Sequence, residues 1–443
     1  MASLAPTLSS TISRLTHLHK PSLHSAITTL KNFRFKQKLS KRIRPFINSS
    51  PSSLSAHFSS AQMRSTVGSD DDLVVLGIET SCDDTAAAVV RSNGEILSQV
   101  VSSQADLLVQ YGGVAPKMAE EAHSKVIDQV VQEALDKANL SESDLSAVAV
   151  TIGPGLSLCL RVGVQKARKL AGTYALPIVG VHHMEAHALV ARLVQGELQF
   201  PFLVLLISGG HNLLILARDL GNYVQLGTTI DDAIGEAYDK TAKWLGLDLR
   251  KSGGPAVEDL AREGLKTQVR LAVESGSINP EIPVSSASSE DRKERANIAA
   301  SFQRVAVLHL EEKCERAIEW ASKIEPSIKH LVVSGGVASN QYVRARLNQI
   351  VEKNCLQLVC PPPKLCTDNG VMVAWTGIEH FRMGRFDPPP PTNEPEDAVL
   401  DLRPRWPLGE EYTEGRSEAR SIRRARIHPS LTSLIQASMQ QQS

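Results

Sequence analysis

Long apolar runs and patterned cysteines are both missing from this sequence. No stretch approaches the roughly 18 consecutive apolar residues that a bilayer-spanning helix needs, so a transmembrane segment is excluded and we expect a soluble or membrane-peripheral protein. The six cysteines show no CxxC spacing, and their density is far below that of a small disulfide-stapled secreted domain. We therefore expect free thiols in a reducing compartment and assign the cysteines no chemistry.

Acidic residues are absent from the first 69 positions, which contain ten Lys or Arg. Ser, Thr and Leu are interspersed among these cations, a composition typical of an organellar transit peptide rather than of a folded domain. The Arg content favours the mitochondrion over the plastid. A disordered basic arm that contacts RNA or acidic lipid is the alternative. In either case we exclude residues 1–69 from the fold.

The rest of the chain has the opposite charge balance, with 38 Lys and Arg against 48 Asp and Glu, so its net charge is close to −10. Such a body cannot hold nucleic acid through bulk charge. Any contact with RNA must therefore be a local basic patch. One candidate patch lies in the C-terminal tail, where a solvated, frayed terminus is the favoured alternative: Arg416, Arg420, Arg423, Arg424 and Arg426.

Length and composition allow two sizeable α/β domains, because 443 residues with 42% hydrophobic and 22% charged residues are ordinary for globular proteins. The apolar runs LVVLGIET, AAAVV and EILSQVV predict a three-stranded antiparallel meander. The runs FLVLLIS, LLILA and YVQLG repeat this order, which indicates two lobes with one plan. Helices are predicted between and after these strands: 118–138, 161–175, 232–246, 254–264, 291–323, 340–353 and 369–384.

His183 and His187 in VHHMEAHA are the first candidates for chemistry. Residues four apart on a helix differ by about 40° in direction, so both imidazoles can bind one ion, while His182 points elsewhere. Two solvated histidines are the common alternative for this spacing. Asp368 is a candidate third ligand, although its position before a helix favours an N-cap role.

Three glycine-containing loops each follow an apolar strand, at residues 153–155, 208–210 and 334–336. Glycines let backbone N–H groups approach phosphate or carbamoyl oxygens. Each loop taken alone is also explained as a tight turn. Together with Asp83 and Asp84 after the first strand, the three loops predict a nucleotide cleft between the two lobes.

These motifs together resemble one protein family over about residues 73–407. The matching segments are GIETSCDDTAAAVV, YGGVAP, GPGLSLCLRVGV, HHMEAH, LLISGGHN, DDAIGEAYDKTAKWLGL, VVSGGVASN, CTDNGVM and RPRW. They are similar to the organellar and bacterial branch of the tRNA N6-adenosine threonylcarbamoyltransferases, formerly named O-sialoglycoprotein endopeptidases.

The resemblance implies a two-lobed actin-like fold, shared with sugar kinases and heat-shock ATPases. It also implies transfer of threonylcarbamoyl from threonylcarbamoyl-adenylate to N6 of the adenosine beside the anticodon, in tRNAs that read codons starting with A. AMP would be released. The expected cofactor is one divalent metal ion per subunit, with iron or zinc the leading choices, and the expected assembly is a homodimer.

The resemblance also assigns site residues. His183, His187 and Asp368 become metal ligands, whereas no side chain is assigned as catalytic and the general base is not identified. Without the resemblance, Asp239 is equally well explained as a helix-surface carboxylate and Asn340 as a helix N-cap. The residues assigned to adenylate binding are Leu206, Ile207, Ser208, Gly209, Gly210, Asp239, Gly254 and Asn340.

The sequence departs from the family after Gly254-Pro255, where about twenty residues that relatives carry are missing between Glu263 and Gly264. We expect residues 70–200 to form lobe I, 201–366 lobe II, 367–407 a C-terminal helix that returns to lobe I, and 408–443 a basic flexible tail. The missing segment makes an inactive or regulatory isoform one alternative function.

Two further alternatives remain. A metallopeptidase is suggested by the paired histidines, but Glu185 follows His183 by two residues and projects about 200° around the helix, away from the metal. An ATPase or chaperone-like module of the same fold would close its lobes on nucleotide without transferring a group, and its function would survive removal of metal.

Overall fold

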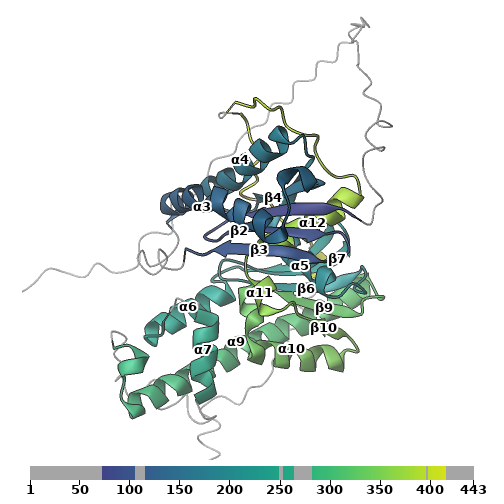
Figure 1. The fold of residues 1–443 in the computed structure, drawn as a ribbon. Helices are drawn as coiled ribbons and strands as arrows, with labels where there is room; N and C mark the ends of the chain where they lie inside the picture. The colour runs from purple at the N-terminus through teal and green to yellow at the C-terminus, as the bar shows by residue number, and fades with distance from the viewer. Residues whose placement is uncertain (1–71, 105–114, 249–252, 264–281, 396–397, 416–443) are drawn as a thin grey trace, which may run out of the picture. The chain divides into compact units, whose positions relative to one another are not determined.

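The computed structural model describes residues 72–104, 115–248, 253–263, 282–395 and 398–415 (Figure 1). The proposed transit peptide and the arginine cluster at 416–426 lie outside these residues. The apparent deletion after Glu263 falls where the described helix ends, and residues 264–281 beyond it are likewise outside.

The first sheet has five strands in the order β3-β2-β1-β4-β5. Strands β1, β2 and β3 form the predicted antiparallel meander, and β4 and β5 extend it in parallel on the side of β1. The central strand β1 is buried on both faces, as its continuous apolar sequence predicts. The bounds are β1 Val74–Glu79, β2 Thr85–Arg91, β3 Ile96–Ser102, β4 Ala147–Gly153 and β5 Ile178–His182.

The second sheet repeats this plan in the order β10-β9-β6-β7-β8-β11. Strands β6, β7 and β8 form an antiparallel meander, β9 and β10 continue in parallel beside β6, and the short β11 pairs with β8. The predicted repeat and mixed α/β class are therefore confirmed. The bounds are β6 Phe202–Ile207, β7 Asn212–Asp219, β8 Asn222–Thr228, β9 His330–Ser334, β10 Gln357–Val359 and β11 Glu410–Glu411.

Helices cover both faces of each sheet, and three apolar clusters separate the resulting layers. One cluster packs α3 and α4 on the first sheet, and another packs α6, α7, α9 and α10 on the second. The third contains α5 and α12 between the two sheets. The bounds are α3 Pro116–Ala138, α4 Ser157–Thr173, α5 His183–Val194, α6 Ile234–Trp244, α7 Gly253–Glu263, α9 Ser289–Ile324, α10 Gln341–Lys353, α11 Pro363–Cys366 and α12 Gly370–Arg382.

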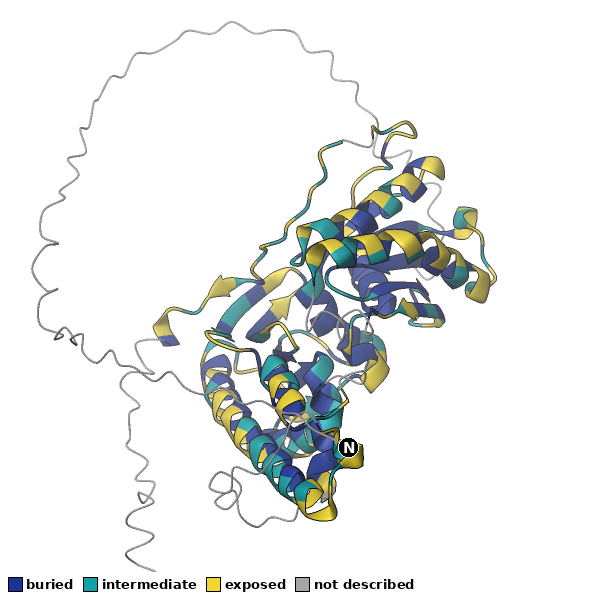
Figure 2. Ribbon diagram, turned by 90° about the vertical axis from the view of Figure 1, so that its left-hand side faces the viewer, coloured by how far each residue is buried: buried dark blue, intermediate teal, exposed yellow. Residues whose placement is uncertain are grey.

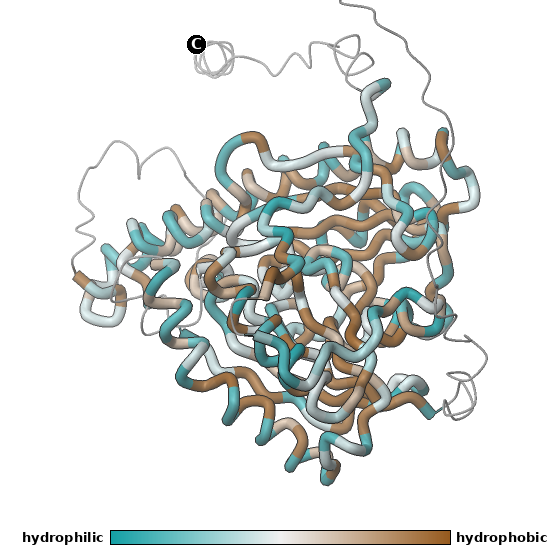
Figure 3. Tube along the Cα trace, turned by 90° about the horizontal axis from the view of Figure 1, so that it is seen from above, coloured by the Kyte–Doolittle hydropathy of each residue, from teal (hydrophilic) through white to brown (hydrophobic). Residues whose placement is uncertain are grey.

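The burial of α5 and α12 follows from their sequences, because helices that are apolar on nearly every face pack inside a protein. Both helices are buried along most of their length. Figure 2 shows buried residues on the strands and inner helix faces, and Figure 3 shows hydrophobic segments running through the middle of the trace. α12 contacts β1, β2 and β4, whereas α5 contacts strands of both sheets.

The prediction that a flexible tail begins at residue 408 needs correction, because the first residues of that segment are part of the fold. Leu408 is buried in the cluster between the sheets, and β11 pairs with β8 directly after it. Tyr412 continues this pairing, with its backbone N–H donating to the Gln225 carbonyl at 2.9 Å. Residues 408–415 therefore belong to the fold. Within the described part of the chain, no helix is both long and apolar enough to cross a bilayer.

Candidate metal centre and adjacent glycine loops

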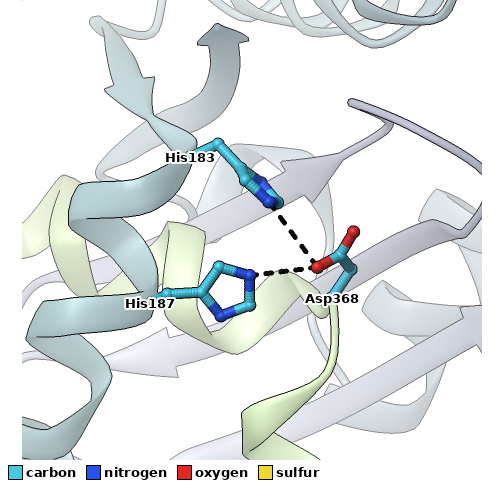
Figure 4. A group of neighbouring side chains, drawn as sticks. All are labelled: His183, His187 and Asp368. Carbon is cyan, nitrogen blue, oxygen red and sulfur yellow. Dashed lines mark hydrogen bonds and ion pairs between the residues drawn. The ribbon is translucent and has the colours of Figure 1, made fainter. Parts of the chain in front are cut away.

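His183, His187 and Asp368 converge on one point (Figure 4). Nε2 of His187 lies 3.0 Å from Oδ1 of Asp368, and Nε2 of His183 lies 3.6 Å from the same oxygen. The two imidazole rings are 4.7 Å apart between centroids. One ligand atom from each residue lies within 4.8 Å of the others, so the spacing deduced for a helix brings both rings to one carboxylate.

His182 starts α5 and sets the direction of its first turn. Its Nδ1 accepts hydrogen bonds from the backbone N–H groups of Met184 at 3.1 Å and Glu185 at 3.4 Å. Its Nε2 lies 3.0 Å from the Trp406 carbonyl, which can only accept. Burial lowers the pKa of His182 to about 4. A neutral imidazole therefore caps the helix that begins with the first ligand, and His182 points away from the other two rings as predicted.

Asp368 precedes α12 but does not cap it, which corrects the N-cap interpretation of this residue. The cap is Asn369, whose side-chain oxygen accepts from the Met372 N–H at 2.9 Å. Because Asn369 already caps the helix by accepting from one of its free N–H groups, the carboxylate of Asp368 is left to face the histidines.

Glu79 completes the site, and sequence reasoning missed it. This carboxylate ends β1, is fully buried, and places Oε2 3.1 Å from Nδ1 of His183. Thr151 donates its hydroxyl to the same oxygen at 2.6 Å, and the Ser81 N–H donates to Oε1 at 2.6 Å. An ionised carboxylate only accepts, so Nδ1 of His183 carries a proton and Nε2 is the nitrogen that a metal ion would bind. A buried acid at the end of a central strand was the available signal.

The charges of this cluster depend on one another. Burial alone would lower the pKa of His183, but the carboxylates of Glu79 and Asp368 raise it to about 9. Burial alone would raise the pKa of Asp368, but His183 and His187 lower it to about 2. The pKa of Glu79 is also lowered, since His183 outweighs its burial. Without a metal ion, the cluster therefore holds a proton that a cation could replace.

The donor set fits a divalent transition metal. Two imidazole nitrogens and one carboxylate oxygen are the ligands that zinc and iron sites use with open positions left for substrate. Nδ1 of His187 is buried and has no hydrogen-bond partner among the described residues. Nε2 is thus the nitrogen of this ring that faces a charged group, and it faces the proposed metal position.

An acidic loop lies beside the metal ligands, between β1 and β2. Burial, followed by the charge of Asp83, raises the pKa of Asp84 to about 7. His123 holds this loop, with Nδ1 2.7 Å from the Thr85 hydroxyl and Nε2 3.1 Å from the Cys82 carbonyl. His123 is completely buried.

Two of the three glycine loops lie side by side at the ends of β6 and β9. Leu206 pairs with Ser334, and a Cβ on Gly335 would come within 2.4 Å of the Ile207 carbonyl. The loop at 153–155 differs, because Gly155 donates its N–H to the Pro404 carbonyl at 3.2 Å. A Cβ on Gly155 would also meet the Ser81 carbonyl at 2.6 Å. Chain segments therefore cover this third loop.

Open space lies in front of the other glycines. A Cβ on Gly210, Gly254 or Gly336 would meet no atom within 4 Å, and one on Gly209 would meet only Oδ2 of Asp239, at 3.9 Å. Asp239 is no surface carboxylate, since Oδ1 accepts from the Gly253 N–H at 2.7 Å at the start of α7. Burial raises the pKa of Asp239, and the charges of Glu236 and Asp83 add to this. Burial, followed by the charge of Asp368, raises the pKa of Asp83.

Asn340, Leu206 and Ile207 are already engaged by the protein. The Asn340 side chain caps α10 by accepting from the Val343 N–H at 3.0 Å, and its Nδ2 donates to Oε1 of Gln303 at 2.8 Å. The side chains of Leu206 and Ile207 are buried in apolar clusters on opposite faces of β6. These two residues could contact a ligand through their backbone alone.

The chain is similar to a family model and to several known proteins. A family model described as tRNA N6-adenosine threonylcarbamoyltransferase matches residues 95–375. The "Probable tRNA N6-adenosine threonylcarbamoyltransferase, mitochondrial" of Arabidopsis thaliana is 75% identical over 398 residues, which cover 84% of this chain and 83% of that protein. The enzyme of Rhizobium etli is 43% identical and covers 75% of this chain and 94% of its own length. That of Novosphingobium aromaticivorans is 42% identical, with 76% and 96% covered.

Proposed function

The chain belongs to the tRNA N6-adenosine threonylcarbamoyltransferase family, and from this premise we propose the details of its reaction. The donor is threonylcarbamoyl-adenylate, the acceptor is N6 of the adenosine beside the anticodon, and AMP leaves. The tRNAs are those that read codons starting with A. The enzyme works in mitochondria, as the name of its Arabidopsis relative states for that protein and as the acid-free, basic leader supports.

The convergence of two imidazoles on one carboxylate carries this proposal. We propose that His183, His187 and Asp368 hold one divalent metal ion, with iron and zinc as the candidates. When held by these three residues, such an ion would supply Lewis-acid chemistry and help to orient the substrate. Glu79 keeps His183 in the tautomer that offers Nε2.

The open space beside the glycine loops supports a site for the adenylate. Gly209 and Gly210 offer backbone N–H groups after β6, where a phosphate or carbamoyl oxygen can approach because no Cβ intervenes. The N–H of Ser208 already donates to the His211 carbonyl at 3.1 Å, so Ser208 contributes by shaping this turn. Asp239 and Gly254 border the same space, and Asn340 fixes the start of α10 behind it. Leu206 and Ile207 contribute through their backbone. Because AMP is an activated leaving group, orientation and charge stabilisation supply most of the rate.

The peptidase alternative loses its general base in this arrangement. Glu185 is buried on the far side of α5, where it binds Tyr223, Gly221 and His380 rather than facing His183 or His187. A water activated by Glu185 could not reach the proposed metal. The transferase remains the function that the site supports.

The decisive experiment incubates the purified chain with threonylcarbamoyl-adenylate and unmodified tRNA, and measures the modified nucleoside by mass spectrometry. We expect product with metal present and at least about 100-fold less after chelation or in His187→Ala, since a Lewis-acid metal supplies several kcal/mol. His309→Ala, at an exposed histidine of α9, is the matched control.

Each component of the proposal has its own contradicting outcome. Absence of product from the metal-loaded wild-type chain would favour the inactive-isoform alternative raised by the missing segment. Equal product after chelation would refute the metal assignment. Equal modification of tRNAs that read codons with another first base would refute the codon specificity, and a monomeric mass in solution would refute the expected homodimer.

A further inference from the structure

The face of α5 opposite the metal ligands carries a buried carboxylate that the reaction does not use. Glu185 is 4% exposed. Its Oε1 accepts from the Tyr223 hydroxyl at 2.6 Å and from the Gly221 N–H at 3.1 Å. Its Oε2 lies 2.9 Å from Nε2 of His380. Three donors to one buried carboxylate form a strong, geometrically restrictive group of hydrogen bonds.

The donors come from different layers of the protein. Gly221 lies in the turn between β7 and β8, and Tyr223 lies on β8, so both belong to the second sheet. His380 lies on α12, which packs against β1, β2 and β4 of the first sheet. Arg385 adds a related contact by donating to the Leu220 carbonyl of the same turn at 3.0 Å. Glu185 therefore joins α5 to the second sheet directly and to the first sheet only through α12.

Tyr223 remains a donor throughout the physiological pH range. Burial, followed by the charge of Glu185, raises the pKa of Tyr223 well above its ordinary value. The Tyr223 hydroxyl therefore donates to the Glu185 carboxylate, as the 2.6 Å contact shows.

The position of Glu185 ties this group to the metal ligands. Glu185 is two residues from His183 and two from His187 on a helix of 12 residues, so its backbone cannot shift without moving both imidazoles. We propose that Glu185 is a positioning residue: by binding the β7–β8 turn and α12, it fixes α5 so that His183 and His187 converge, and it couples the placement of the second sheet to the metal centre. This inference rests on the proposed metal site.

Tyr223→Phe is the test variant, because it removes the hydroxyl and keeps the ring in the apolar cluster. Tyr238→Phe is the matched control: Tyr238 is also completely buried, on α6, and its hydroxyl has no hydrogen-bond partner among the described residues. The full chain of each is stripped of metal, titrated with Co²⁺, and followed by visible absorption. Thermal unfolding of each variant is measured in parallel.

We expect Tyr223→Phe to bind Co²⁺ about 10-fold more weakly, in the range typical for loss of an outer-shell contact, and to shift the absorption bands of the Co²⁺-saturated protein. Tyr238→Phe should keep the wild-type affinity and bands. A general loss of stability would not shift the bands at saturation. Glu185→Gln, which still accepts from Tyr223 and Gly221, should shift the affinity less than Glu185→Ala.

Wild-type affinity and bands in Tyr223→Phe would overturn the inference. If the wild-type chain itself binds no Co²⁺ through His187, as judged against His187→Ala, the proposed metal site fails separately. Hydrogen exchange then still tests the positioning role in the metal-free proteins. Tyr223→Phe must speed exchange of the α5 amides about 10-fold relative to Tyr238→Phe, and equal rates in the two variants would overturn the inference as well.

Discussion

At the scale of single residues, His182, His183 and His187 perform different tasks within one short segment. His182 caps α5 through Nδ1, whereas His183 and His187 direct Nε2 to Asp368. Helical geometry was sufficient to predict which two rings face the same way. It could not predict Glu79, because the contact of Glu79 with His183 joins positions 104 residues apart. Partners of this kind depend on how the strands pair.

The orientation of His183 by Glu79 leads to a prediction about metal affinity. Glu79→Gln removes the negative charge that holds the proton on Nδ1 of His183, and we expect metal affinity to fall about 10-fold to 100-fold. Glu95→Gln is the control, since Glu95 is an exposed residue in the turn before β3. Competition with a chromogenic chelator measures both variants. Unchanged affinity in Glu79→Gln would show that His183 is oriented by other contacts.

The buried cap His182 predicts a loss of stability in acid. Its folded-state pKa of about 4 lies below the ordinary value of 6.5, so the unfolded chain binds the extra proton more readily. The contribution of the neutral His182 cap to the free energy of unfolding is present above pH 6.5 and is lost as the pH falls toward 4. This lowers the free energy of unfolding by at most about 3 kcal/mol. His182→Asn keeps a cap that cannot be protonated.

Urea unfolding of the chelator-treated wild-type and His182→Asn chains measures this effect on both sides of the window. We expect the wild type to lose more stability than His182→Asn on acidification. Parallel losses in the two proteins would mean that other groups account for the acid sensitivity. The comparison is needed because neighbouring carboxyl groups titrate in the same range.

At the scale of elements, the predicted helices agree with the observed ones to within a few residues, because their apolar periodicity and caps are local properties. The helix predicted at 161–175 is observed as α4, at Ser157–Thr173. The N-cap of α12 was wrong by one residue, since both Asp368 and Asn369 are good caps and the sequence does not rank them. The histidines opposite Asp368 decide the matter, and they come from another element.

The close packing of α12 on β1 predicts that Gly77 cannot be replaced by a larger residue without loss of stability. A Cβ on Gly77 would come within 2.3 Å of both the Ala374 nitrogen and the Gly370 carbonyl oxygen, which are backbone atoms of α12. Gly77→Ala must therefore push α12 away from the sheet and move Asp368 with it. We expect a loss of about 3 kcal/mol or more in unfolding free energy and weakened metal binding.

Gly227→Ala is the matched control for this variant, because the added Cβ on β8 would meet only Leu214 Cβ at an ordinary 3.8 Å. Urea unfolding and a metal titration are measured for both chains. Similar stabilities in Gly77→Ala and Gly227→Ala would mean that α12 adjusts freely, and that close packing does not hold Asp368 in place.

At the scale of the whole molecule, the repeat of one strand order in two sheets was predictable, because each meander shows in the local pattern of apolar runs and turns. The connections between the sheets were not. Glu185 with Tyr223, and Leu408 with the cluster between the sheets, join segments far apart in sequence. The C-terminal residues are the clearest case, since a charged, aromatic-poor tail gave no indication of a strand.

The packing of residues 408–415 against the rest of the fold leads to a prediction about how far the chain can be shortened at its C-terminal end. Ending the chain at Pro407 removes Leu408, β11 and the ring contact of Tyr412 with Trp320, whose centroids are 5.8 Å apart. Ending it at Gly415 keeps all of these. We expect the free energy of unfolding of the shorter chain to fall by about 3 kcal/mol, mainly because Leu408 and the aromatic pair are no longer buried. We also expect weaker metal binding, because Gly409 packs against the Tyr223 carbonyl. Thermal unfolding and Co²⁺ titration of the two chains check this. Equal behaviour would mean that the second sheet and the metal centre are held together without the C-terminal strand.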